Sequence, residues 1–134
     1  AMADPDEKLP PLLLAVEDRD HEGVKKLLES KIDPDESRDP SGNTALAIAA
    51  ESDLAQCATH LIQAKADLEG RNVHGNTPLL LAVQENSLKV LKILIEAKAD
   101  VTAKNKTGLD AKILAEPASR LHLELVRPRP TKNP

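Results

Sequence analysis

The sequence contains no phenylalanine, tyrosine or tryptophan, so its core must be built from leucine, isoleucine, valine and alanine. A chain of 134 residues that is 40% hydrophobic has room for one domain with a core of moderate size. Aliphatic side chains suit closely spaced helices better than stacked sheets, whose strands usually draw on aromatic residues. The composition therefore predicts an all-α fold.

Cysteine is almost absent too, because Cys57 stands alone. One cysteine excludes an internal disulfide and a cysteine-based zinc site. No apolar run reaches the roughly 18 residues of a membrane span, and no signal peptide is visible. Since Ala1 precedes Met2, we expect residues 1–7 to be a disordered cloning remnant. We expect a cytoplasmic location, with the periplasm or secretion as the alternative if a leader was removed.

One phrase occurs twice in the same register. Residues 75–82 read GNTPLLLA, and residues 42–49, which lie 33 positions earlier, read GNTALAIA. In each phrase a threonine that can cap a helix precedes a short apolar run, and Pro78 suits a first helical position. Closing phrases that begin at Lys31, Lys65 and Lys98 recur at spacings of 34 and 33 residues. The chain is therefore a tandem repeat.

Each unit is predicted to hold two helices and a turn. The second helix of the second unit carries a stripe at helical spacing: Leu54, Cys57, Ala58, Leu61 and Ile62. We place the units at about 8–40, 41–73, 74–106 and 107–126. The last unit degrades after Pro117 and is predicted to cap the array. Residues 127–134, rich in proline and arginine, are predicted to be an extended tail.

A period of 33 residues with Gly-x-Thr-Pro-Leu at the first helix and Ala-Asp after the second resembles the ankyrin repeat. The resemblance covers residues 8–126 and implies a helical solenoid. In that family the turns form a row of fingers, the first helices line a concave face, and this surface usually binds another protein.

Two positions depart from the family's pattern. The histidine that usually follows Thr-Pro-Leu is replaced by Leu13, Ala47, Leu80 and Ile113. The glycine that usually ends the second helix is replaced by Lys31, Lys65 and Lys98. That position commonly needs a left-handed backbone, which costs a residue other than glycine about 1 kcal/mol. A lysine near the helix C-terminus offsets part of this cost.

No pattern in the sequence indicates catalysis. The histidines lie in four different units with no pair at metal-binding spacing: His21, His60, His74 and His122. Cys57 lies on an apolar stripe and is predicted to pack in the core. The Gly-Asn-Thr turns lack the Lys-Ser or Lys-Thr of a phosphate loop. We expect no catalytic, cofactor or metal site, and therefore no enzyme and no small-molecule substrate.

The resemblance implies a contact surface at the finger tips and the ends of the first helices. Side chains held on rigid turns also bind with little loss of entropy. Val73, with His74 beside it, is the best anchor candidate. The full predicted set is Pro40, Ser41, Asn43, Glu51, Ser52, Val73, His74, Asn76, Gln84, Glu85, Lys106 and Thr107.

The predicted function is that of a non-catalytic adaptor that binds a partner protein and is itself a monomer. The alternative is a stand-alone ankyrin inhibitor that occludes an enzyme's active site, as bacterial periplasmic members do. Charge changes along the chain from a net −6 in residues 1–40 to +4 in residues 98–134, which could orient a partner. The overall charge of −4 and the missing aromatics argue against a nucleic-acid partner.

Overall fold

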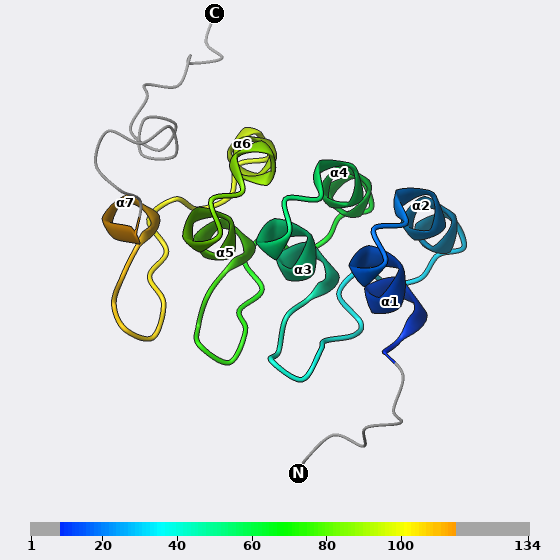
Figure 1. Cartoon of the computed structure of the whole chain (residues 1–134), viewed down its shortest axis with the longest axis horizontal. Helices are drawn as coiled ribbons and strands as arrows, with labels where there is room; N and C mark the ends of the chain where they lie inside the picture. Colours follow the sequence, from blue (N-terminus) through cyan, green and yellow to red (C-terminus); the bar gives the residue numbers. More distant parts are fainter. Residues whose placement is uncertain (1–8, 115–134) are drawn as a thin grey trace, which may run out of the picture.

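The computed structural model describes residues 9–114. Within this range the chain forms helices and no strand, so the predicted all-α fold is confirmed. Figure 1 shows α1, α3, α5 and α7 in one row and α2, α4 and α6 in a second row, with finger-like loops before α3, α5 and α7 pointing the same way. The helices are α1 (Pro11–Glu17), α2 (His21–Glu29), α3 (Ala45–Glu51), α4 (Ala55–Gln63), α5 (Pro78–Gln84), α6 (Leu88–Glu96) and α7 (Ala111–Leu114).

Threonine caps start the two inner first helices, as the repeated phrase predicts. The Oγ1 atom of Thr44 accepts the N–H of Ala47 at 3.2 Å, and that of Thr77 accepts the N–H of Leu80 at 3.3 Å. Pro78 occupies the first turn of α5, where its missing N–H would have no helical partner. Both predicted caps are therefore confirmed.

The two rows of helices bury different amounts of their surface. Residues 45–50 of α3 and 78–83 of α5 are all buried, because each of these helices packs against the first helices on either side and against its own second helix. The second helices bury a single stripe, which in α4 is Cys57, Ala58 and Leu61. The predicted packing role of Cys57 is confirmed.

Left-handed backbone ends every second helix. Lys31, Lys65 and Lys98 have φ angles of 72°, 71° and 76°, as their place at the family's glycine position predicts. The turns between paired helices show the same conformation at Arg19, Asp53 and Asn86, for which no sequence signal was recognised. The predicted end of the capping unit and the tail lie outside the described residues.

A glycine at position 65 should stabilise the fold. Lys65→Gly removes the steric cost of a side chain at φ 71° and should raise the free energy of unfolding by about 1 kcal/mol. The melting temperature would rise by about 4 °C. Thermal unfolding followed by circular dichroism checks this. Lys65→Ala is the control, because it removes the charge but not the strain, and an equal gain in that variant would contradict the explanation.

Candidate partner-binding surface

Each finger is closed by the same pair of hydrogen bonds. In the first finger the N–H of Asp39 donates to the carbonyl of Asn43 at 3.0 Å, and the N–H of Gly42 donates back to Asp39 at 2.9 Å. The fingers at residues 72–76 and 105–109 repeat this pattern. A side chain could not replace Gly75, because a Cβ there would lie 2.8 Å from Lys106. The tips are therefore tight turns with fixed backbones.

Hydrogen bonds also join each finger to the next one. The N–H of Val73 donates to the carbonyl of Ser41 at 3.0 Å, and the N–H of Lys106 donates to that of His74 at 3.2 Å. These bonds run between residues that lie at or beside the tips. The three fingers thus form one connected row, which Figure 1 shows along the lower edge of the molecule.

Two arginines strengthen the same row, and sequence analysis missed them. The Nη1 atom of Arg38 donates to the carbonyl of Gly42 at 3.0 Å and to that of Arg71 in the next unit. Arg71 repeats this arrangement with Gly75 at 2.8 Å and with Lys104. Their spacing of 33 residues was the signal that could have identified them.

Asn43 and Asn76 differ from the expectation that they lie exposed at the finger tips. Both side chains are buried, with 3% and 5% of their surface accessible. The reason is an amide ladder, in which Asn72 donates from Nδ2 to Oδ1 of Asn43 and Asn105 donates in the same way to Asn76, each at 3.0 Å. These two asparagines lie at the bases of the fingers and hold them together.

The other predicted contact residues are exposed and fall into two groups. The finger tips carry Pro40, Ser41, Val73, His74, Lys106 and Thr107. The C-terminal ends of α3 and α5 carry Glu51, Ser52, Gln84 and Glu85. A hydrogen bond of 3.1 Å from Asn43 Nδ2 to Glu51 Oε1 links a finger base to a helix end. The two groups are thus neighbours.

Acidic groups gather around the end of α3. Partial burial raises the pKa of Glu51, and the negative charges of Asp39, Glu85 and Glu17 raise it further. The hydrogen bond from Asn43 acts in the opposite direction and lowers it. Glu17 and Asp39 were not in the predicted set, because only the folded chain brings them close to Glu51. This part of the surface is an acidic cluster formed by three units.

A comparison with protein families finds a match between residues 12–105 and the model described as Ankyrin repeats (3 copies). The chain belongs to the ankyrin-repeat family. A comparison with curated proteins finds no match. Ankyrin repeats are generally protein-protein interaction modules, and the finger row and helix ends of this ankyrin domain form the kind of surface that the resemblance implies.

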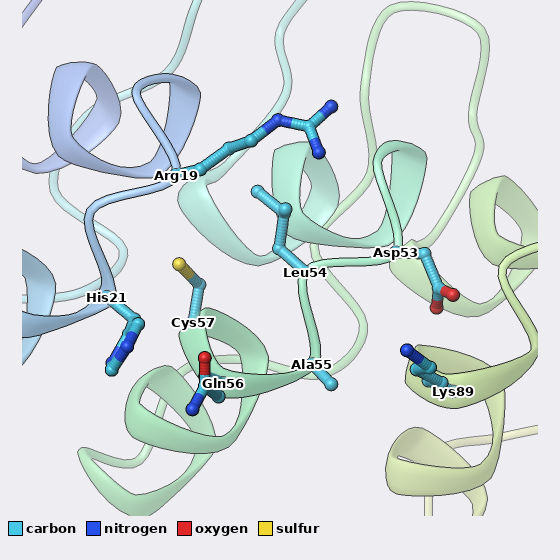
Figure 2. A pocket seen from close by; sticks show the side chains of 8 residues that line it. All are labelled: Arg19, His21, Asp53, Leu54, Ala55, Gln56, Cys57 and Lys89. Atoms are coloured by element: carbon cyan, nitrogen blue, oxygen red, sulfur yellow. The ribbon is translucent and has the colours of Figure 1, made fainter.

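The ankyrin domain also has a pocket of about 320 Å³ on the side of its second helices. Figure 2 shows it at the start of α4, with Arg19 above and Lys89 at one edge. The Asp53 carboxylate is engaged there, since it accepts the N–H of Val90 at 3.0 Å and so caps α6 from the preceding unit. Burial raises the pKa of the Cys57 thiol, and the charge of Asp20 adds to this, which disfavours the nucleophilic thiolate.

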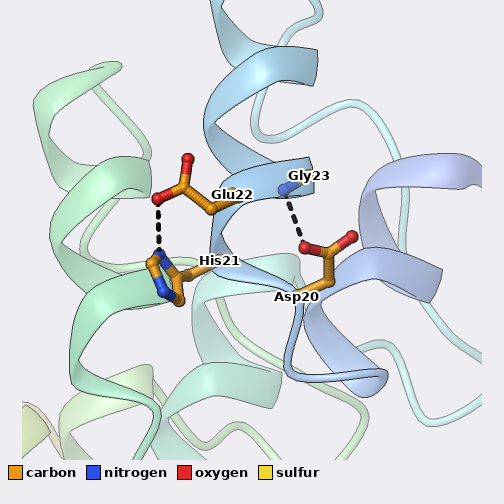
Figure 3. A network of polar contacts seen from close by, with 4 residues as sticks. All are labelled: Asp20, His21, Glu22 and Gly23. Atoms are coloured by element: carbon orange, nitrogen blue, oxygen red, sulfur yellow. Dashed lines mark hydrogen bonds and ion pairs between the residues drawn. The ribbon is translucent and has the colours of Figure 1, made fainter.

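The start of α2 forms a second group of polar contacts, shown in Figure 3. Asp20 caps this helix through a hydrogen bond from the N–H of Gly23 at 3.0 Å. Nδ1 of His21 lies 3.7 Å from Oε1 of Glu22, and the His21 ring stacks on His60 with centroids 5.9 Å apart. Residues 9–114 contain no cluster of three or more metal-ligating side chains, and no helix among them could cross a bilayer.

Removing one rung of the amide ladder should loosen the fingers. The Asn72 side chain accepts the N–H groups of His74 and Asn76 and donates to Asn43, all within 3.0 Å. Asn72→Ala leaves these buried groups without partners and should lower the free energy of unfolding by about 1–3 kcal/mol. Urea unfolding measures the loss, and hydrogen exchange at the amides of His74 and Asn76 locates it.

Asn72→Asp is the matched control for this prediction. A carboxylate keeps both acceptor bonds within the finger, as Asp39 does in the first finger through the N–H groups of Ser41 and Asn43. It should therefore protect the finger amides from exchange better than alanine does. Equal exchange in the two variants would contradict the assigned role of Oδ1.

Neutralising Glu51 should stabilise the ankyrin domain at neutral pH. The folded state holds this proton more tightly than the unfolded state, so the contribution of Glu51 to stability falls as the pH rises above its ordinary pKa of 4.5. Glu51→Gln keeps an acceptor for Asn43 and removes the charge. The midpoint of urea unfolding of the variant, relative to wild type, should rise between about pH 4 and about pH 7. Glu96→Gln, on exposed α6, controls for net charge, and an equal rise there would contradict this account.

Proposed function

We propose that this ankyrin domain is a non-catalytic module that binds a partner protein through the finger tips and the adjacent ends of α3 and α5. The observation that carries the proposal is the exposure of tip side chains on backbones that are tied to one another, as in the bond from Val73 to Ser41. Such side chains lose little freedom on binding, so more of the contact energy is available for affinity.

The chemistry of the surface suggests which partner it fits. Val73 is 51% exposed and offers an apolar anchor near the middle of the finger row. The acidic cluster around Glu51 lies toward the first unit, and Lys106 lies on the last finger. The fitting partner has an apolar contact point, basic groups on one side of it and an acidic group on the other.

Variants of the finger tips test the proposal. A triple variant, Val73→Glu with His74→Ala and Lys106→Glu, changes three exposed side chains and should keep the helical circular dichroism spectrum. Partners that wild type captures from its native source would be purified, and their affinity measured by calorimetry. We expect the triple variant to bind at least tenfold more weakly, a loss of about 1.4 kcal/mol or more.

The matched control changes three exposed side chains of the second helices: Lys25→Glu, Gln56→Glu and Gln63→Ala. It should bind the purified partner as wild type does. If the finger variant keeps full affinity, or the control loses as much, the finger surface is not the binding site. When the partner is an enzyme, its turnover at a saturating concentration of the ankyrin domain separates an adaptor, which leaves turnover intact, from an occluding inhibitor.

A further inference from the structure

The face of α1 and α2 that points away from α3 is less covered than its counterparts in the inner units. Leu14 is 42% exposed, whereas Ile48 and Leu81, at the same position of α3 and α5, are 5% and 4% exposed. The inner units differ from the first in having a preceding unit packed on them, and Figure 1 shows α1 and α2 at the end of their rows. Position 14 therefore belongs to a surface that is built to be covered.

Other positions of α1 and α2 show the same contrast. Leu27 is only partly buried, whereas Leu61 and Leu94 at its position are fully buried. Pro11 is exposed, although the equivalent Ala45 and Pro78 are buried. We call Pro11, Leu14, Ala15 and Leu27 the N-terminal face. All four are apolar, unlike the polar outer face that a capping repeat usually presents.

The opposite end has a matching uncovered position. Ile113 of α7 is 61% exposed, whereas Leu13, Ala47 and Leu80 at its position are at most 1% exposed. Those three lie in helices that pack against both their own second helix and the first helix of the following unit. Ile113 and Leu14 thus lie on the two kinds of surface that meet wherever one unit packs on the next.

Charge favours bringing these two ends together. Residues 9–40 carry nine acidic and five basic side chains, whereas residues 98–114 carry two acidic and four basic ones. Like ends would repel each other, and unlike ends would attract. We propose that the N-terminal face binds the end of a second copy of this chain at Ile113, so that copies stack head to tail and continue the solenoid.

This arrangement uses different surfaces on the two copies, so each copy keeps one free end. Association should therefore proceed beyond a dimer as the concentration rises. The earlier expectation of a monomer applies to dilute solution. The finger tips take no part in the stacking, so the proposal stands or falls independently of partner binding.

Sedimentation of the wild-type chain at increasing concentration is the first test. The weight-average mass should rise steadily from the 14.4 kDa of one chain without a plateau at twice that value. Interference optics are needed, because the chain has no tryptophan or tyrosine. A mass that stays at one chain up to about 1 mM would overturn the proposal, since that is the range of weak association.

Two single variants determine which ends meet. Leu14→Lys blocks the N-terminal face, and Ile113→Glu blocks the other end; both positions are exposed, and retained ellipticity at 222 nm verifies the fold. Each variant alone should remain a monomer. A mixture should form a dimer of about twice the monomer mass and no larger species, because one free end of each kind remains.

The other outcomes are equally decisive. If Ile113→Glu alone still dimerises, the faces meet head to head and the proposed arrangement is wrong. If the mixture stays monomeric, the ends do not recognise each other. Val73→Glu is the matched control, because it places a charge at an apolar position of similar exposure between the ends. It should associate as wild type does, and its loss of association would implicate the fingers.

Discussion

The fold depends on the burial of one small apolar helix between two others. The first helix of a unit is too short to be stable alone, and six successive residues of α3 are buried only because α1, α4 and α5 surround them. Stability in such an array is the sum of what each unit and each interface contributes. The absence of aromatic side chains fits this constraint, since alanine and leucine allow these helices to pack closely.

A polar network lies beside the apolar one and performs a different task. Asparagine amides, arginine side chains and backbone bonds connect the fingers of successive units. The apolar interface holds the units together, whereas the polar network sets the positions of the finger tips. Side chains such as Val73 and His74 can therefore vary with little effect on the core, because they contribute to neither network.

Local signals predicted most of the fold. Thr77 and Pro78 identified a helix start because capping depends on neighbours in sequence, and Lys65 identified a left-handed residue through its place in the repeat. The burial of Asn76 was not predicted, since an amide ladder requires partners from another unit. The acidic cluster around Glu51 was missed for the same reason. Periodicity shows which residues are equivalent but not which ones touch.

The amide ladder has a direction, because the asparagine of each later unit donates to the asparagine of the unit before it. The units at 41–73 and 74–106 each offer both an acceptor and a donor, so a duplicated copy of either would fit between its neighbours. The first unit does not, because Leu9 occupies the position of Asn43 and Asn76. In evolution or in design, this domain can therefore be lengthened from its middle without breaking the ladder.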